Sequence, residues 1–306
     1  MKKILIIIMS IIAIGVSAQQ SPHYTQYLFN PYVLNPAIAG TVDYYQLRMV
    51  NRLQWIGFTD APFTASASMF GPLNKKHKNM GVGGSFLIDE VGPTSMNSIN
   101  GSYAYNLNLS EEVHISGGIT AGIIQYKLDG AALLQENDQN KVTGFSSDDE
   151  YLLGASEVKF LPDAMIGFYL WTTGYSVGIS ADKLFNNKFT MYNGKTAFSR
   201  LRSHIYLFGA YKFFINRKWY TEPSLMVKFV YPAIPQVDIN AKAIYKNTMW
   251  AGLSFRTGDA IGLLGGYLYK KKYYLGISYD WTYSSIRNYN YGTFELFLGY
   301  KFDKLK

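Results

Sequence analysis

Apolar side chains recur at every second position along most of this chain. In residues 98–107 the intervening positions are small or polar, and the alternating apolar set is Ile99, Tyr103, Tyr105 and Leu107. Successive side chains of a β-strand point to opposite faces, so this segment has one apolar face and one polar face. The same pattern predicts fourteen strands, at residues 43–53, 61–70, 80–89, 96–107, 112–126, 162–171, 174–183, 202–214, 218–230, 235–246, 248–257, 260–270, 272–283 and 292–302.

The length and number of these strands favour a transmembrane β-barrel. A tilted strand needs about ten residues to cross a bilayer, and bacterial barrels have even strand numbers. Several polar faces carry charges that cannot face lipid and are expected to face the lumen: Asp182, Glu222, Lys228, Asp238, Lys242 and Glu295. The predicted fold class is therefore all-β, an outer-membrane barrel of about 14 antiparallel strands formed by residues 41–306.

The connections between the predicted strands support the same architecture. With both termini in the periplasm, the two long connections, 127–161 and 184–201, fall on the outer side, and five of the six periplasmic connections are tight. Porin-like barrels share this asymmetry. Aromatic residues near strand ends are expected to form interfacial girdles; they are Tyr126, Trp171, Tyr211, Trp219, Tyr220, Tyr231, Tyr245, Tyr269, Tyr273, Trp281 and Tyr283.

Composition narrows the alternatives. Fifty of the 306 residues are aromatic, only 16% are charged, and the mean hydropathy is −0.04. The apolar residues are too dispersed for a helical membrane protein, which needs runs of about 20. A soluble β-sandwich or propeller is the alternative fold, although its solvent face usually carries more charge. Because the chain has no cysteine, disulfides, thiolate metal sites and cysteine nucleophiles are excluded.

Residues 1–18 have the pattern of a secretory signal peptide. Two lysines precede an apolar run from Ile4 to Val16, and residues 16–18 (Val-Ser-Ala) fit a cleavage site. We expect the mature chain to begin at Gln19, with a retained anchor helix as the alternative. An exported chain has no routine access to nucleic acid, so the net charge of +8 does not indicate a DNA-binding surface. The expected location is the bacterial outer membrane, reached by Sec-type export.

Residues 19–40 differ from the strands and form a separate non-strand segment. They contain two Asn-Pro steps, Asn30-Pro31 and Asn35-Pro36, which disfavour helix and favour turns. The segment is also rich in aromatic and apolar residues, which is not the composition of a flexible tail. We expect it to pack as a plug in the lumen or against a partner, and the sequence leaves both possibilities open.

Several motifs resemble catalytic or metal sites, but ordinary strand and loop residues explain them better. Residues 174–178 match the G-x-S-x-G pattern, but a nucleophile elbow needs a strand-turn-helix context, and this segment alternates as a strand. The four histidines lack metal-ligand spacing, and the acidic residues of the 127–161 connection lack the spacing of a calcium loop. We therefore expect neither catalysis nor a metal or other cofactor.

Two lysine-rich stretches fall on predicted periplasmic turns. They are Lys75-Lys76-His77-Lys78 and Lys270-Lys271-Lys272. Such turns are either simply solvated beside the lipid headgroups or form a docking surface for a periplasmic partner. The sequence does not decide between these two explanations.

The N-terminal segment and the first strand carry a family resemblance. The matching residues are Tyr24-Thr25-Gln26-Tyr27, Asn30-Pro31, Asn35-Pro36-Ala37-Ile38-Ala39-Gly40 and Arg52-Leu53-Gln54-Trp55-Ile56-Gly57-Phe58, followed by Ala61-Pro62. In this order and spacing the chain resembles the PorP/SprF family of outer-membrane proteins of the type IX secretion system in Bacteroidota. The remaining strands are generic for a barrel.

The resemblance implies a non-enzymatic component of type IX protein secretion. Members of the family are needed for secretion or surface attachment of particular large cargo proteins, including gliding adhesins, which are recognised through a C-terminal domain. They also associate with periplasmic components of the secretion and gliding apparatus. By this resemblance the expected partner-binding residues are Tyr24, Gln26, Tyr27, Asn30, Pro31, Asn35, Pro36, Gly40, Arg52, Gln54 and Trp55.

Three classes of function are compatible with such a barrel. The preferred one is a cargo-specific escort or anchor, whose partners are outer-membrane lipid, the cargo and periplasmic components. The second is a porin-like or hydrophobic-solute channel, but a porin should have charges on many lumen faces, and here Gly, Ser, Ala and Asn dominate with few charges. The third is a lipid-modifying enzyme, for which the sequence shows no Ser-His pair near the outer girdle.

Overall fold

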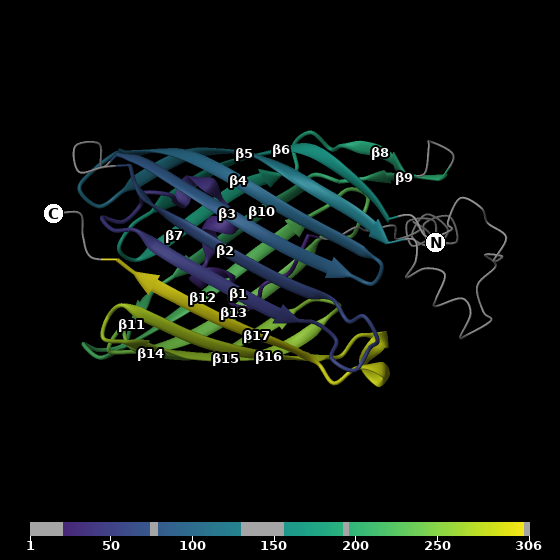
Figure 1. Cartoon of the computed structure of the whole chain (residues 1–306). Coiled ribbons are helices and arrows are strands. Elements are labelled where there is room, and N and C mark those ends of the chain that lie inside the picture. Colours follow the sequence, from purple (N-terminus) through teal and green to yellow (C-terminus); the bar gives the residue numbers. More distant parts are fainter. Residues whose placement is uncertain (1–20, 74–78, 130–155, 192–195, 303–306) are drawn as a thin grey trace, which may run out of the picture.

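The structure, a computed structural model, describes residues 21–73, 79–129, 156–191 and 196–302. Within these ranges, fourteen long antiparallel strands form one closed barrel (Figure 1). The barrel closes through two pairings, β1 with β17 and β10 with β12. The barrel strands are β1 (Gln46–Leu53), β2 (Phe63–Pro72), β3 (Met80–Val91), β4 (Thr94–Asn108), β5 (His114–Asp129), β6 (Ser156–Trp171), β7 (Tyr175–Asp182), β10 (His204–Tyr211), β12 (Trp219–Phe229), β13 (Gln236–Tyr245), β14 (Met249–Arg256), β15 (Ala260–Tyr269), β16 (Tyr273–Thr282) and β17 (Thr293–Lys301).

Shorter elements complete the described chain. A two-residue strand continues β10, and a small hairpin is separate from the barrel sheet. Three 3₁₀ turns precede β1, and a fourth lies between β16 and β17. None of the helices in these ranges is long and apolar enough to span a membrane. The short elements are β8 (Lys188–Met191), β9 (Thr196–Arg200), β11 (Phe213–Phe214), η1 (Tyr27–Phe29), η2 (Pro31–Val33), η3 (Pro36–Ile38) and η4 (Ser285–Tyr289).

The predicted alternation is confirmed as an outward and an inward face of the wall. On β4 and β5, Ile99 and Ile119 are 64% and 58% exposed, whereas Ser98 and Ser116 are 6% and 4% exposed. The outward side chains are mainly Ile, Leu, Val, Phe and Tyr, which is the composition of a lipid-facing band. Because the period is two, the same strands present their small, polar and charged residues to the lumen.

The two ends of the barrel differ in their connections. The connections from β5 to β6 and from β7 to β10 lie at one end, and short turns such as residues 246–248 lie at the other. Following the asymmetry of outer-membrane barrels, we call these the outer and the periplasmic end. The predicted 127–161 loop is shorter than expected, because β5 continues to Asp129 and β6 begins at Ser156. Its acidic residues 148–150 lie outside the described ranges.

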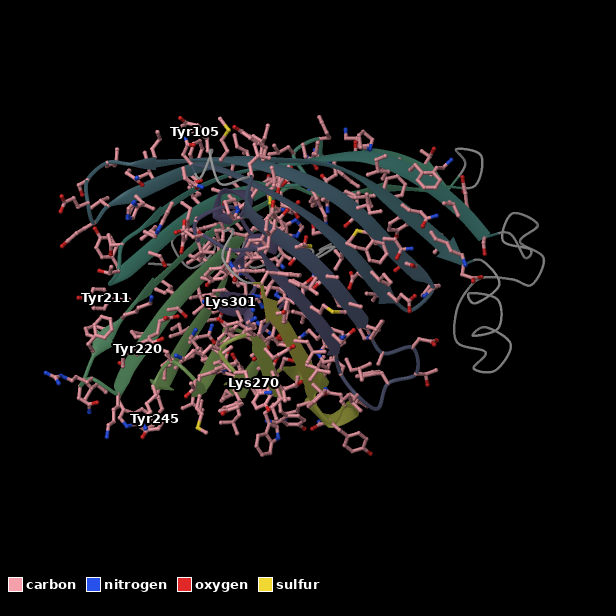
Figure 2. All side chains as sticks on the ribbon, turned by 60° about the vertical axis from the view of Figure 1, so that its left-hand side comes forward. Tyr105, Tyr211, Tyr220, Tyr245, Lys270 and Lys301 are labelled. Atoms are coloured by element: carbon pink, nitrogen blue, oxygen red, sulfur yellow. The ribbon has the colours of Figure 1, made fainter. Side chains whose placement is uncertain are left out.

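Most of the residues predicted for the aromatic girdles lie on the outward face at strand ends, and three do not. Tyr211 and Tyr245 mark the girdle at the periplasmic end (Figure 2). The prediction is wrong for Tyr126, which is 9% exposed and packs inside the outer mouth against Phe189 of the β8–β9 hairpin. It is also wrong for Tyr220, which packs into an inward apolar cluster. Trp171 is likewise on the inward face, where it stacks on Tyr169. All three rings lie on the face that the alternation of their strands assigns to the lumen, so the error was to expect strand-end aromatic residues in the girdle whatever their face.

Candidate functional site

Residues 21–40, which we call the lumen segment, run inside the barrel from the outer end to the periplasmic end (Figure 1). At the outer end, the Ser21 backbone N–H donates to His204 Nε2 at 3.0 Å, and Lys183 Nζ donates to Ser21 Oγ at 2.9 Å. At the periplasmic end, Gly40 lies against Gly81, at the start of β3. The chain therefore crosses the lumen before it enters the wall at β1.

A carboxylate from the last strand binds the outer half of the lumen segment. The two oxygens of Glu295 accept hydrogen bonds from the consecutive backbone N–H groups of Thr25 and Gln26, each at 2.9 Å. The Thr25 hydroxyl donates to Asp280 Oδ2 at 2.6 Å and accepts from Arg52 Nη1 at 2.9 Å. Because one carboxylate accepts from two adjacent N–H groups, it sets both the position of the segment along the barrel axis and the direction of its backbone there.

The carboxylates that hold the segment are paired with buried arginines. Arg52 bridges Asp280 at 2.9 Å and Glu295 at 3.1 Å, and all three side chains are at most 3% exposed. Arg256 pairs with Asp238 at 3.1 Å and lies 3.7 Å from Asp280. Removing one partner from such a buried group leaves an unpaired charge, which typically costs about 3–5 kcal/mol. We call these five residues the lumen charge network.

The periplasmic half of the segment is held mainly by aromatic packing. The Phe29 ring lies between Trp250 and Phe297, with centroid distances of 4.5 and 5.5 Å. Tyr32 stacks on Phe70 at 4.5 Å with an interplanar angle of 12°. These contacts bury aromatic surface that would otherwise be exposed in the lumen.

Asn35 ties the turn η3 to the opposite side of the wall. Its Oδ1 accepts from the Ala37 backbone N–H at 2.9 Å, as in an N-cap. Its Nδ2 donates to the carbonyl oxygens of Phe168 at 2.9 Å and Ile179 at 3.2 Å. The side chain of one Asn-Pro step thus caps a turn and bonds β6 and β7 at the same time.

Glycines in the wall make room for the backbone of the segment. A Cβ atom on Gly81 would lie 2.0 Å from the Ala39 carbonyl oxygen, and one on Gly118 would lie 2.5 Å from the Ala37 nitrogen. No side chain fits at these distances, and glycine in a strand often marks close approach of another backbone. The inward glycines of β3 and β5 therefore follow the path of the lumen segment.

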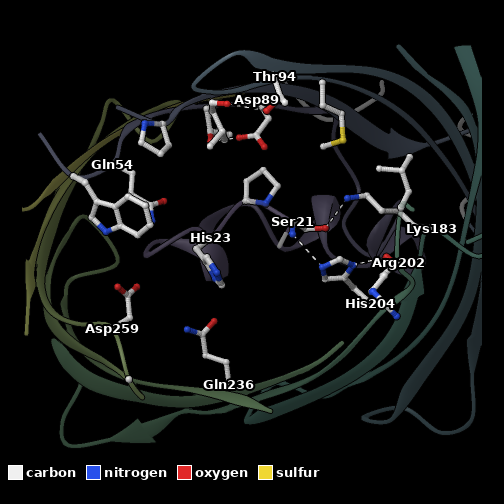
Figure 3. A pocket seen from close by; sticks show the side chains of 18 of the residues that line it. Ser21, His23, Gln54, Asp89, Thr94, Lys183, Arg202, His204, Gln236 and Asp259 are labelled. Carbon is white, nitrogen blue, oxygen red and sulfur yellow. Dashed lines mark hydrogen bonds between the residues drawn. The ribbon is translucent and has the colours of Figure 1, made fainter. Parts of the chain in front are cut away.

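Above the segment, the outer mouth holds a vestibule of about 610 Å³. Residues 21–23 form part of its floor, with the His23 side chain facing the space (Figure 3). Its walls carry both signs of charge, because Asp89 and Asp259 line it together with Lys183 and Arg202. A cavity of this size and polarity accepts a protruding loop or side chains of another molecule.

The structure brings nine of the eleven expected partner-binding residues into the barrel interior, where their contacts are with this chain. Gln54 and Trp55 lie apart from them and line the vestibule. The bond between Arg52 and Thr25 is the one expected if the segment threads the lumen instead of docking below the barrel. Binding of a partner by these residues stays a prediction. The nine are Tyr24, Gln26, Tyr27, Asn30, Pro31, Asn35, Pro36, Gly40 and Arg52.

Sequence reasoning missed part of the lumen charge network. The alternation predicts an inward Glu295 and an inward Asp238, and both are buried in the lumen. Asp280 and Arg256 are also buried there, so the lumen carries more charge than expected. The signal was available for Asp280, because it alternates with Trp281, which is outward and exposed.

The motif at residues 174–178 lies at the start of β7, which pairs with β6 and β10. The next elements that the structure describes are the strands β8 and β9, so the serine is part of the wall. Within the described ranges, no group of three His, Asp or Glu side chains is placed to hold a metal ion.

Solved structures share the barrel architecture at low sequence identity. The CymD monoaromatic hydrocarbon channel aligns with a TM-score of 0.52 and 10% identity, covering 94% of each chain. A FadL homologue from Pseudomonas aeruginosa aligns with a TM-score of 0.49 and 12% identity, covering 92% of this chain and 95% of that one. At 10% identity, the likeness to CymD shows the fold alone.

The family of the chain follows from its sequence as a whole. No curated protein matches it. The family model described as "Type IX secretion system membrane protein PorP/SprF" matches residues 16–300, which span both the lumen segment and the barrel. The chain is therefore an integral outer-membrane barrel that belongs to the PorP/SprF family of type IX secretion system membrane proteins.

Proposed function

We propose that this barrel binds a secreted cargo protein, through the cargo's C-terminal domain, at the outer vestibule and holds it at the cell surface. Membership of the family places the chain in type IX secretion. Cargo docking is supported by the way the barrel interior is occupied. Residues 21–40 fill the lumen, and a vestibule of about 610 Å³ lies between them and the outer end. A filled lumen below an open vestibule favours docking of a protein from outside over conduction of solutes through the barrel.

The lumen segment has the contacts of a permanent floor. Glu295 binds two consecutive backbone N–H groups of the segment, and the wall at Gly81 is shaped to the backbone of Ala39. Displacing the segment would leave the Glu295 and Asp280 carboxylates without these donors in the interior. In this proposal most of the family motif acts indirectly, by holding the floor in place.

Trp55 is the residue that we propose contacts the cargo. Its φ is +53°, a value that is rare for a bulky side chain, and its backbone N–H donates to Thr293 Oγ1 at 3.2 Å. Strained backbone of this kind clusters at functional sites. Trp55 and Gln54 line the vestibule together, and an aromatic anchor beside polar groups is typical of protein-binding hot spots.

The test places a photo-crosslinking amino acid at position 55 in cells and identifies the crosslinked protein by mass spectrometry. We expect a secreted protein, crosslinked through its C-terminal domain. The matched control is position 281, because Trp281 is 68% exposed on the outward face. It should crosslink lipid, not cargo.

A second measurement separates docking from conduction. The double variant Q54A/W55A should lower the cargo displayed at the surface, while the amount of heat-modifiable barrel stays at the wild-type level. Normal display by this variant would contradict the proposal. Solute conductance by the wild-type barrel in planar bilayers, together with normal display by the variant, would favour the porin-like or hydrophobic-solute channel.

Periplasmic components of the secretion and gliding apparatus remain proposed partners of the opposite end. The family membership supports an association with the type IX secretion system as a whole, without identifying a component. Crosslinking from the short turn at residues 109–113, which faces the periplasm, would identify such a component directly. Crosslinks to lipid alone from this turn would contradict contact at that position.

A further inference from the structure

Among the residues that the structure describes, the basic side chains of the periplasmic end lie along one arc of the barrel; Lys75, Lys76 and Lys78 lie outside the described ranges. The described basic residues lie in the short turns after β11, β13 and β15, and the described part of these turns contains no acidic residue. The acidic residues described at this end are Asp43, Glu111 and Glu112, which lie in other connections. We call the following exposed residues the basic rim: Arg217, Lys218, Lys246, Lys270 and Lys271.

The turn between β15 and β16 places two lysines in a conformation that lysine rarely adopts. Lys270 and Lys271 have φ values of +49° and +57°, and the Lys272 N–H donates to the Tyr269 carbonyl oxygen at 3.0 Å across the turn. Positive φ at both central residues is the arrangement of a type I′ turn, for which Asn-Gly is strongly preferred. Two lysines are poor residues for forming this turn, which points to a use for their charges.

The lysine side chains are held beside the aromatic girdle. Lys270 Nζ lies 5.2 Å from the centroid of the Tyr269 ring, and Lys246 Nζ lies 5.2 Å from that of Tyr245. Both distances are within the range of cation–π contacts. Because interfacial aromatic residues lie at the level of the lipid headgroups, these ammonium groups lie at the same height.

We propose that the basic rim binds the phosphate groups of anionic phospholipids in the periplasmic leaflet of the outer membrane. A cluster of four to eight basic residues beside a membrane-spanning element is typical of anionic-lipid recognition. Placement beside the girdle favours lipid over an acidic periplasmic protein, which would meet these charges from below the barrel. The lipid contact gathers anionic lipid along β12–β16.

The test uses the full barrel in phosphatidylcholine nanodiscs that contain increasing fractions of labelled phosphatidylglycerol. The variant K270N/K271G installs the residues that the turn prefers and removes two charges. At about fivefold per basic residue, its apparent affinity for phosphatidylglycerol should fall roughly 10- to 30-fold. Its unfolding temperature in pure phosphatidylcholine should equal or exceed that of the wild type, because the turn itself is improved.

The matched control K127N/K159N removes two lysines from the outer end, where their side chains are 44% and 40% exposed. It changes the net charge equally and should bind phosphatidylglycerol as the wild type does. Wild-type affinity of K270N/K271G for phosphatidylglycerol would overturn the proposal. So would a lower unfolding temperature of that variant in phosphatidylcholine, or loss of a crosslinked periplasmic protein with lipid affinity unchanged, which would assign the rim to a protein partner.

Discussion

The two halves of the lumen segment are held by different forces. Residues 21–26 bind charged side chains, above all the Glu295 carboxylate and its partner Arg52. Residues 27–40 fit by shape, with rings stacked on the wall and the backbone lying against glycines such as Gly81. In the outer half, charged hydrogen bonds set the position of the segment, because each acceptor must meet a particular donor. In the periplasmic half, close packing sets the path of the backbone, because a packed interior tolerates little overlap of atoms.

The largest effect is expected at the charged half. Replacing Glu295 with alanine removes the acceptor of the Thr25 and Gln26 N–H groups and leaves Arg52 with one buried carboxylate fewer. The unfolding free energy should fall by about 3–5 kcal/mol, as for other buried charge pairs that lose one partner. Urea unfolding of the barrel in lipid vesicles measures this loss.

The variant E295Q is its control, since it keeps the shape and removes the charge. It should lose less stability than E295A, because its amide oxygen still accepts one of the two backbone hydrogen bonds. Wild-type stability of E295Q together with a large loss in E295A would show that packing of the side chain, and not the charge of the carboxylate, holds the outer half.

An intermediate effect is expected at the half held by shape. A Cβ atom on Gly81 would lie 2.0 Å from the Ala39 carbonyl oxygen, so G81A forces the segment or the strand to move. Overpacking of this kind costs about 1–3 kcal/mol. Limited proteolysis should also cut the lumen segment faster in this variant.

The matched control is G101A on the neighbouring strand, where a Cβ atom has no heavy atom within 4 Å. Its unfolding free energy should stay within about 0.5 kcal/mol of the wild type, as for other substitutions away from packed sites. If both variants behave alike, close approach of the segment to β3 is not important for stability.

The smallest of the three effects is expected at Asn35, a hydrogen-bonding side chain within the half that is held by shape. N35A removes the cap on the Ala37 N–H and the hydrogen bonds to Phe168 and Ile179. The expected loss is about 1–2 kcal/mol, because the turn keeps its proline and its packing. A loss as large as that of E295A would mean that the shape-held half also depends on a single polar anchor.

The barrel wall was largely predictable because strand alternation is a local property. The fourteen strands and their inward and outward faces follow from neighbouring residues, as Ile99 beside Ser98 illustrates. The errors at Tyr126 and Tyr220 arose where other elements pack inside the barrel. Both residues have the inward parity of their strands, so alternation assigned their faces correctly, and the error came from inferring a girdle from nearness to a strand end alone.

The sequence by itself determined the strands, their two faces and the turn-rich character of residues 19–40. It did not determine where that segment lies, because Thr25 and Glu295 are 270 residues apart. Only closure of the barrel decides this: β1 pairs with β17, which places Arg52 opposite Glu295 at the site where Thr25 binds. The physical reason is that alternation is set by the geometry of adjacent residues, whereas the lumen exists only after the first and last strands have joined.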